Sequence, residues 1–290
     1  MSVLLIDDVS DLWYSEINKL KIEYFNMPIT MNGKAIAYDM GKEFQHDKFF
    51  SDFRKGFEVK SETMSTEDYM EVFEPYLKAN ENVLYLHHSD KLNRYFGALT
   101  DAIDRLKQTY PNQTITLVDT ENVSMGYGII AYEVGILHKR GATDSEIIEY
   151  VDKIKHQIAT YAVVDDVNTL KDNEKLSTSQ NVVGSALGVK SVLAITSAGT
   201  VEVVEKFASK KKAILKLFDR LRQEGVNLKD YPIGISYVGD KENAEVLRDK
   251  IVEVVGEDAI IWVQPMSPIL SILLGYGAVV LSYHVSRKKY

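Results

Sequence analysis

Acidic residues follow two apolar segments of the chain, at positions where phosphoryl chemistry is sometimes found. Asp7-Asp8 comes directly after the apolar residues 3–6, and Asp119 follows a second such segment. Carboxylates clustered in this way can hold magnesium, so an enzyme built on Asp7, Asp8 and Asp119 is one hypothesis. The Asp-x-Asp spacing of one class of phosphatase is absent. We expect instead a turn in which Asp8 or Ser10 caps the next helix.

Two adjacent histidines, His87 and His88, are the next candidates for chemistry, because imidazole is a common metal ligand. Neighbouring residues of a strand point to opposite faces of a sheet, so the two rings cannot easily share one ion. We therefore predict no metal site. We expect one histidine to be buried or at an interface and the other to be exposed.

Glycines stand close together at Gly126-Tyr127-Gly128. This segment lacks the third glycine and the later acidic partner of a dinucleotide-binding fingerprint. We expect these glycines to permit close packing of the backbone, and we predict no cofactor.

Two polar loops precede predicted helices and carry the groups best suited to an anionic ligand. One runs from Ser61 to Ser65 and the other from Ser89 to Arg94. Open α/β sheets bind ligands beyond their strand ends, and exposed N–H groups at helix starts favour anions. The loops therefore predict an anionic head-group site.

Composition narrows the class of protein. The 290 residues have 34 basic and 42 acidic side chains, a net charge of −8, and no cysteine. The absence of cysteine excludes disulfides and thiolate sites, and the acidic balance argues against a protein that coats nucleic acid. The first residues have no basic segment before their apolar run, so we predict no signal peptide and a cytoplasmic location. A lysine-rich segment, Lys206 to Lys216, is either a solvated helix face or a surface for an acidic partner.

The elements that must position these groups alternate in the first half of the chain. Apolar segments at 3–6, 82–87 and 114–118 predict buried strands, and amphipathic patterns predict the helices between them. We expect helices over 11–24, 45–54, 94–110, 124–139 and 144–154, extended chain over 24–31, and a helix capped by Ser65 and Asp68. This alternation is typical of a parallel α/β sheet.

The second half mixes strands and helices less regularly. We expect strands over 161–164, 192–196, 201–204, 233–238 and 259–263, and helices over 210–223 and 242–255. Met266 to Tyr283 carries no charge, but Pro268 and two glycines interrupt it. We predict one or two buried strands with a glycine turn there, and no transmembrane segment.

The whole chain resembles the DegV family of bacterial fatty-acid-binding proteins. Ile6 to Leu12 is similar to the family's Thr-Asp-Ser-Ser-Ala-Asp-Leu, and Ser124 to Gly128 matches its Ser-x-Gly-x-Gly. Leu187 to Leu193 is similar to its Leu-x-Ile-Lys-Pro-Ile-Leu. The order and spacing of these motifs hold from residue 3 to about residue 283.

The resemblance implies a fold and a role. It implies an N-terminal parallel α/β domain, residues 1–160, and a C-terminal α/β domain with a mixed sheet, residues 161–290, with the ligand in the cleft between them. Family members carry a fatty acid and present its carboxylate to a separate kinase subunit. The resemblance therefore implies a carrier with a bound fatty acid, and no catalytic residues.

The resemblance also assigns site residues. Ser61 and Asn93 stand where the family binds the head group, and Arg94 adds a cation that can clamp an anion or offset Glu62. Leu273 stands in place of a late family histidine. Further pocket residues are Thr63, Ser89, Gly126, Gly128, Ile269 and Leu273. Lys175 stands in place of a family arginine that docks the partner, and Lys206, from the lysine-rich segment, is the second candidate for partner docking.

Two functions stay open at this point. The first is a carrier of a long-chain fatty acid. The second is a diverged family member that binds another small amphiphile, or that acts as a protein-interaction module without fatty-acid phosphorylation. Glu62 and Leu273 favour the second, because each changes the chemistry of the head-group site.

Overall fold

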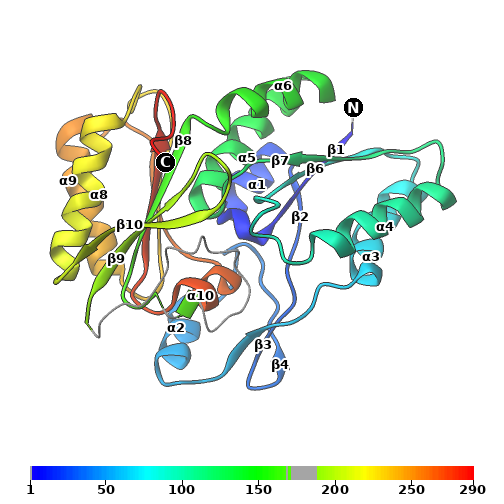
Figure 1. The fold of residues 1–290 in the computed structure, drawn as a ribbon. Coiled ribbons are helices and arrows are strands. Elements are labelled where there is room, and N and C mark those ends of the chain that lie inside the picture. The colour runs from blue at the N-terminus through cyan, green and yellow to red at the C-terminus, as the bar shows by residue number, and fades with distance from the viewer. Residues whose placement is uncertain (1, 168, 171–187) are drawn as a thin grey trace.

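Strands and helices alternate through the first half of the chain (Figure 1). The computed structural model describes residues 2–167, 169–170 and 188–290. The elements of this half are β1 (Val3–Asp7), the 3₁₀ turn η1 (Asp8–Ser10), α1 (Tyr14–Leu20), β2 (Glu23–Phe25), β3 (Ile29–Met31), β4 (Lys34–Ala35), α2 (His46–Arg54), β5 (Val59–Ser61), α3 (Thr66–Lys78), β6 (Val83–His87), α4 (Phe96–Thr109), β7 (Ile115–Asp119), α5 (Ser124–Lys139) and α6 (Asp144–Ile154).

Four of these strands form a parallel sheet in the order β2-β1-β6-β7. Both faces are covered, which explains why the strands are apolar throughout. Leu5 and Tyr85 pack on the side of α3 and α4. Leu4 and Ile6 point to the other side and pack with residues of α1, α5 and α6. The parallel sheet is the one that the alternating sequence predicts.

A small antiparallel sheet, β4-β3-β5, lies beside the parallel sheet and was not predicted from the sequence. Its strands are only two or three residues long, too short to show a clear pattern. It matters for function because β5 ends at Ser61, and so this sheet positions the first of the two polar loops.

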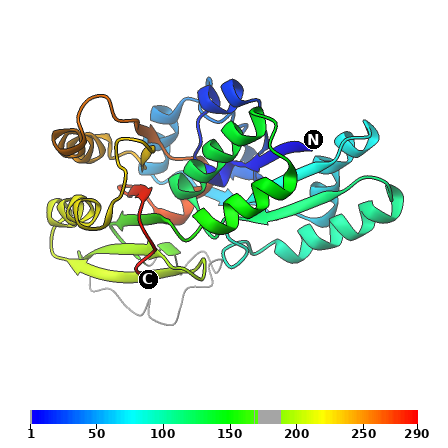
Figure 2. The same cartoon turned by 90° about the horizontal axis from the view of Figure 1, so that it is seen from above.

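The second half contains β8 (Ile158–Val164), β9 (Lys190–Ile195), β10 (Val201–Phe207), α8 (Lys210–Glu224), β11 (Ile233–Tyr237), α9 (Lys241–Val255), β12 (Ile261–Pro265), α10 (Pro268–Leu274) and β13 (Val279–His284). Its six strands form a mixed sheet in the order β10-β9-β8-β13-β11-β12. Only the β11–β12 pair is parallel in this sheet. Helices α8 and α9 lie side by side on one face (Figures 1 and 2), and α5 packs on the other.

The uncharged segment from Met266 to Tyr283 differs from its prediction. Its first part is helix α10, with Pro268 in the first turn and five of its seven residues buried. Gly275, with φ of 79°, ends the helix, and β13 follows as a buried strand. A short apolar helix that is mostly buried shows no period that distinguishes it from a strand. Within the described part of the chain, no helix has the length and apolarity needed to cross a membrane.

The start of the chain also differs in detail. The predicted helix over 11–24 is the shorter α1, which ends because Lys21 adopts a left-handed conformation with φ of 57°. The cap is different too, since the Asp7 side chain accepts a hydrogen bond from the Val9 amide and so caps the 3₁₀ turn. Trp13, at the start of α1, makes no side-chain cap.

Candidate functional site

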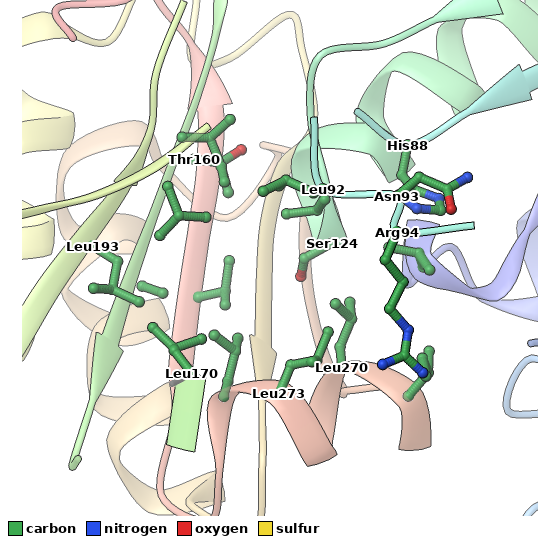
Figure 3. Close-up of a pocket in the computed structure, with 18 of the residues that line it drawn as sticks. His88, Leu92, Asn93, Arg94, Ser124, Thr160, Leu170, Leu193, Leu270 and Leu273 are labelled. Carbon is green, nitrogen blue, oxygen red and sulfur yellow. The ribbon is translucent and has the colours of Figure 1, made fainter. Parts of the chain in front are cut away.

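A pocket lies where the two larger sheets and α10 meet (Figure 3). Most of its lining is aliphatic. Leu193, Ala194 and Ile195 come from β9, Ala162 from β8, and Ile269, Leu270, Leu273 and Leu274 from α10. Among the described residues, those of the lining with polar side chains are Ser61, His88, Asn93, Arg94, Tyr95, Ser124 and Thr160. This combination of apolar walls and a few polar groups is typical of a site for an amphiphile.

Three of the polar lining residues lie close together, whereas Thr160 comes from β8. Figure 3 shows His88, Asn93 and Arg94 on one side of the pocket and Leu170 and Leu193 on the opposite side. The three polar residues belong to the loop that connects β6 to α4. A ligand with a polar head and an apolar tail matches this division.

Hydrogen bonds hold the β6–α4 loop in place. The Ser89 amide donates to the Asn122 carbonyl at 3.0 Å, and the Ser89 hydroxyl donates to the Gly199 carbonyl at 2.7 Å. The Asn93 amide donates to the Ser89 carbonyl at 3.1 Å. Ser89 therefore supports the loop that carries the head-group candidates. Its hydroxyl bonds to Gly199, and Ser89 does not line the pocket.

Asn93 is buried, and its side chain is only partly satisfied. Its Oδ1 accepts a hydrogen bond from the Tyr95 amide at 2.9 Å. Its Nδ2 is buried and has no hydrogen-bond partner among the described residues. Burial raises the pKa of the nearby Tyr69 hydroxyl, and Asn93 lowers that pKa in part. The Tyr69 hydroxyl and Asn93 Nδ2 nevertheless form no hydrogen bond with each other. A donor left unpaired in an apolar pocket is costly unless a ligand accepts from it.

Arg94 and Ser61 lie together at the exposed edge of the pocket. The Arg94 Nη2 donates to the Ser61 hydroxyl at 3.2 Å, and the guanidinium lies 4.4 Å from the centre of the Tyr95 ring. Glu62 is exposed and does not line the pocket. Its carboxylate accepts a hydrogen bond from the Thr30 hydroxyl at 2.7 Å, which directs its charge toward Thr30.

Three other predicted pocket residues lie outside the lining. Thr63 is exposed. A Cβ at Gly126 would collide with the Thr160 hydroxyl, and one at Gly128 would lie 2.5 Å from the Ser10 carbonyl. The two glycines let α5 approach β8 and the turn after β1, so they serve packing rather than ligand contact.

Of the two predicted docking residues, the structure describes one. Lys206 is exposed on β10. Lys175 lies outside the described residues, and so does the segment around it. The two predicted wall residues of α10, Ile269 and Leu273, both line the pocket.

The two histidines are both buried, which corrects the expectation that one of them would be exposed. His87 is 2% and His88 is 5% exposed, and the His87 ring packs against Phe96 at the start of α4. His87 Nδ1 is 2.7 Å from the His88 carbonyl. His88 lines the pocket and His87 does not, as expected for neighbours that point to opposite faces.

The Asp7 carboxylate contacts the His88 ring. Its Oδ2 is 3.0 Å from His88 Nδ1 and accepts a hydrogen bond from the Tyr85 hydroxyl at 2.6 Å. Complete burial alone would raise the pKa of Asp7, but the charge of His88 and these hydrogen bonds hold that pKa below its ordinary value. Asp7 is therefore an ionised carboxylate in the core, stabilised by its partners.

The other two acids of this region are also buried. Burial and the charge of Asp7 raise the pKa of Asp8 well above its ordinary value, which favours its protonated form. Burial raises the pKa of Asp11 to about 6. The described residues contain no group of three or more side chains placed to hold a metal ion.

Several lining residues carry no signal in the sequence that would place them in the pocket. His88, Thr160, Ala162 and Leu193 lie in strands or at their ends, where the sequence shows burial but not which cavity a residue faces. Of the segment Val123 to Val134, only Val123 and Ser124 line the pocket. Most of the remainder of α5, up to Gly135, is buried, and the helix contacts strands of both larger sheets.

Two solved bacterial structures have a fold similar to that of this chain. The chain superposes on the Bacillus subtilis protein described as DegV, a fatty acid binding protein, with a TM-score of 0.81, 18% identity and 99% and 100% of the two chains covered. It superposes on the Streptococcus pneumoniae Fatty Acid Kinase (Fak) B3 protein, loaded with linoleic acid, with a TM-score of 0.79, 19% identity and the same coverage.

Sequence relatives cover the chain equally well. A DegV domain-containing protein of Clostridium perfringens is 26% identical over 97% of this chain and 93% of its own length. A second, from Lactococcus lactis, is 26% identical over 98% of both chains. The family model described as "Uncharacterised protein, DegV family" matches residues 3–285. Since the match spans almost the whole length, the chain belongs to the DegV family.

Proposed function

We propose that this protein binds a long-chain fatty acid or a closely related amphiphile in the pocket between its two larger sheets. The acyl chain lies against the aliphatic walls of β9 and α10, and the head group lies near Asn93, Ser61 and Arg94. Burying each methylene contributes about 0.8 kcal/mol, so the walls alone supply useful affinity. The protein acts as a carrier and not as an enzyme.

The unpaired Nδ2 of Asn93 is the observation that carries this proposal. It is a buried hydrogen-bond donor without a partner among the described residues, in a pocket that is otherwise mostly apolar. A carboxylate at this position would accept from it and lie near the guanidinium of Arg94. One structure of similar fold is described as a fatty acid binding protein and another is loaded with linoleic acid, which supports the same ligand class.

A kinase partner is the finer part of the proposal. The similarity to a fatty acid kinase B3 protein supports a role in presenting the head group to a kinase subunit. Arg94 is exposed, and Ser61 is half-buried, so the head-group side of the pocket is near the surface. Lys206 belongs to the surface proposed for docking. Formation of acyl phosphate from bound fatty acid, kinase subunit and ATP would test this step.

Native mass spectrometry of the freshly purified protein tests the ligand class. We expect a bound species that organic extraction releases as a fatty acid. If no amphiphile is released, and none is taken up on titration with a fatty acid, the proposal is wrong and the diverged, protein-interaction alternative is favoured.

Asn93→Asp tests the head-group site. The new carboxylate keeps an acceptor for the Tyr95 amide, but it replaces the free donor with a negative charge. We expect fatty-acid affinity to fall by about tenfold or more, since a charged partner of the wrong sign replaces a hydrogen bond. The exposed Asn18→Asp on α1 is the matched control and should bind normally.

A further inference from the structure

His88 differs from the other histidines of the described residues because it lines the pocket. It is 5% exposed, lines the pocket, and lies on the same side as Asn93 and Arg94 (Figure 3). Its ring has two nitrogens with separate environments, so each can be considered in turn.

Nδ1 of His88 is held by Asp7. The Nδ1 to Oδ2 distance is 3.0 Å, and Asp7 is completely buried. Asp7 is itself fixed, because the Tyr85 hydroxyl donates to Oδ2 at 2.6 Å and the Val9 amide donates to Oδ1 at 2.9 Å. A carboxylate held in this way accepts the Nδ1 proton and sets the orientation of the ring, as carboxylates do for histidines in other sites.

Nε2 of His88 is then the nitrogen left for the pocket. No hydrogen bond joins it to any residue in the described part of the chain, and the pocket around it is mostly aliphatic. The carboxylate of a bound fatty acid would be repelled by the charge of Asp7, with little water to screen the two charges. A proton on Nε2 would place a cation between the two carboxylates and remove that penalty.

On the basis of the proposed function, we infer that His88, oriented by Asp7, donates its Nε2 proton to the carboxylate of the ligand and thereby selects acids over neutral amphiphiles. Asn93 then contributes a neutral donor, and Arg94 a cation at the exposed edge. Leu273 is apolar and offers no such donor.

Two substitutions separate the functions of the ring nitrogens. His88→Asn places an amide near the Nδ1 position, where it can still donate to Asp7, but it removes the nitrogen at the Nε2 position. His88→Gln reaches the Nε2 position with a neutral donor. His87→Asn is the matched control, because His87 is buried beside His88 and does not line the pocket.

Affinities of delipidated protein for hexadecanoic acid and hexadecanol provide the readout. We expect the wild type to prefer the acid, and His88→Asn to lose about tenfold or more of that preference while its affinity for the alcohol is unchanged. His88→Gln should recover part of the preference, and His87→Asn should resemble the wild type. An unchanged ratio of acid to alcohol affinity in folded His88→Asn would overturn the inference. Failure of the wild type to bind either compound would instead contradict the proposed function.

Discussion

The carboxylate of Asp11 accepts a hydrogen bond from the Ser267 amide at 2.8 Å, across 256 positions of sequence. The same carboxylate accepts from the Ser124 hydroxyl at 2.6 Å, and the Asp11 carbonyl accepts from the Gln264 side chain. One buried residue therefore joins the turn after β1 to the start of α5 and to the segment between β12 and α10. These are elements that surround the pocket.

Asp11 should make the protein less stable as the pH rises. Burial raises its pKa from 3.8 to about 6, so between these values the folded state holds a proton that the unfolded chain has released. Its contribution to the free energy of unfolding should fall by on the order of 2–3 kcal/mol as the pH rises through this window. Urea denaturation from pH 4 to 7 should show a smaller decline for Asp11→Asn than for the wild type. Identical slopes in the two proteins would contradict this assignment.

His46 should have the opposite effect. It is buried among Trp13, Tyr38, Phe44 and Phe50, and burial lowers its pKa from 6.5 to about 4. The folded state keeps this ring neutral, so its contribution is present above pH 6.5 and is lost as the pH falls toward 4.

His46→Phe should remove that loss and also the buried, unpartnered Nε2. We expect the variant to be more stable than the wild type at pH 5 by about 1–2 kcal/mol, as the free energy of unfolding in urea will show. Gln45→Ala, at the preceding residue of the chain, should leave the acid sensitivity unchanged. An equal loss of stability in wild type and His46→Phe would mean that other groups cause it.

Gly128→Ala should destabilise the fold. The added Cβ would lie 2.5 Å from the Ser10 carbonyl, a backbone atom that cannot move away without shifting the turn after β1. We expect a loss of about 1–3 kcal/mol in the free energy of unfolding. Gly97→Ala is the matched control, because its Cβ would enter open space near the start of α4 and should be neutral or stabilising by up to about 1 kcal/mol. Equal effects of the two substitutions would be inconsistent with close packing at Gly128.

Ala194→Leu should shorten the preferred acyl chain. Ala194 lines the pocket from β9, and a larger side chain would occupy space needed by the ligand tail. We expect the optimum among saturated fatty acids to move down by about two or three carbons, since each methylene in an apolar site is worth about 1 kcal/mol or more. Titration with acids of increasing length provides the measurement. Ala159→Leu, a buried alanine of β8 outside the lining, should lower stability without moving the optimum.

Local signals in the sequence were sufficient for much of the fold. The capping boxes at Ser65 with Asp68 and at Thr143 with Glu146 depend on residues three apart, so the starts of α3 and α6 could be predicted. The parallel sheet was equally clear, because strands buried on both faces require continuous apolar segments. The family motifs extended that prediction to the mixed sheet of the second half.

Long-range packing decided the parts of the fold and of the site that local signals in the sequence do not determine. The apolar residues of α10 are as typical of a buried strand as of a buried helix. The local sequence therefore does not decide between them, and tertiary packing does. His87 and His88 are chemically identical in the sequence, and the position of the pocket relative to β6 makes one of them a lining residue. The sequence by itself determined the family, the alternation of elements and the polar loops. The tertiary structure decided which polar groups share the pocket, because that depends on strand order and on contacts between residues as distant as Asp11 and Ser267.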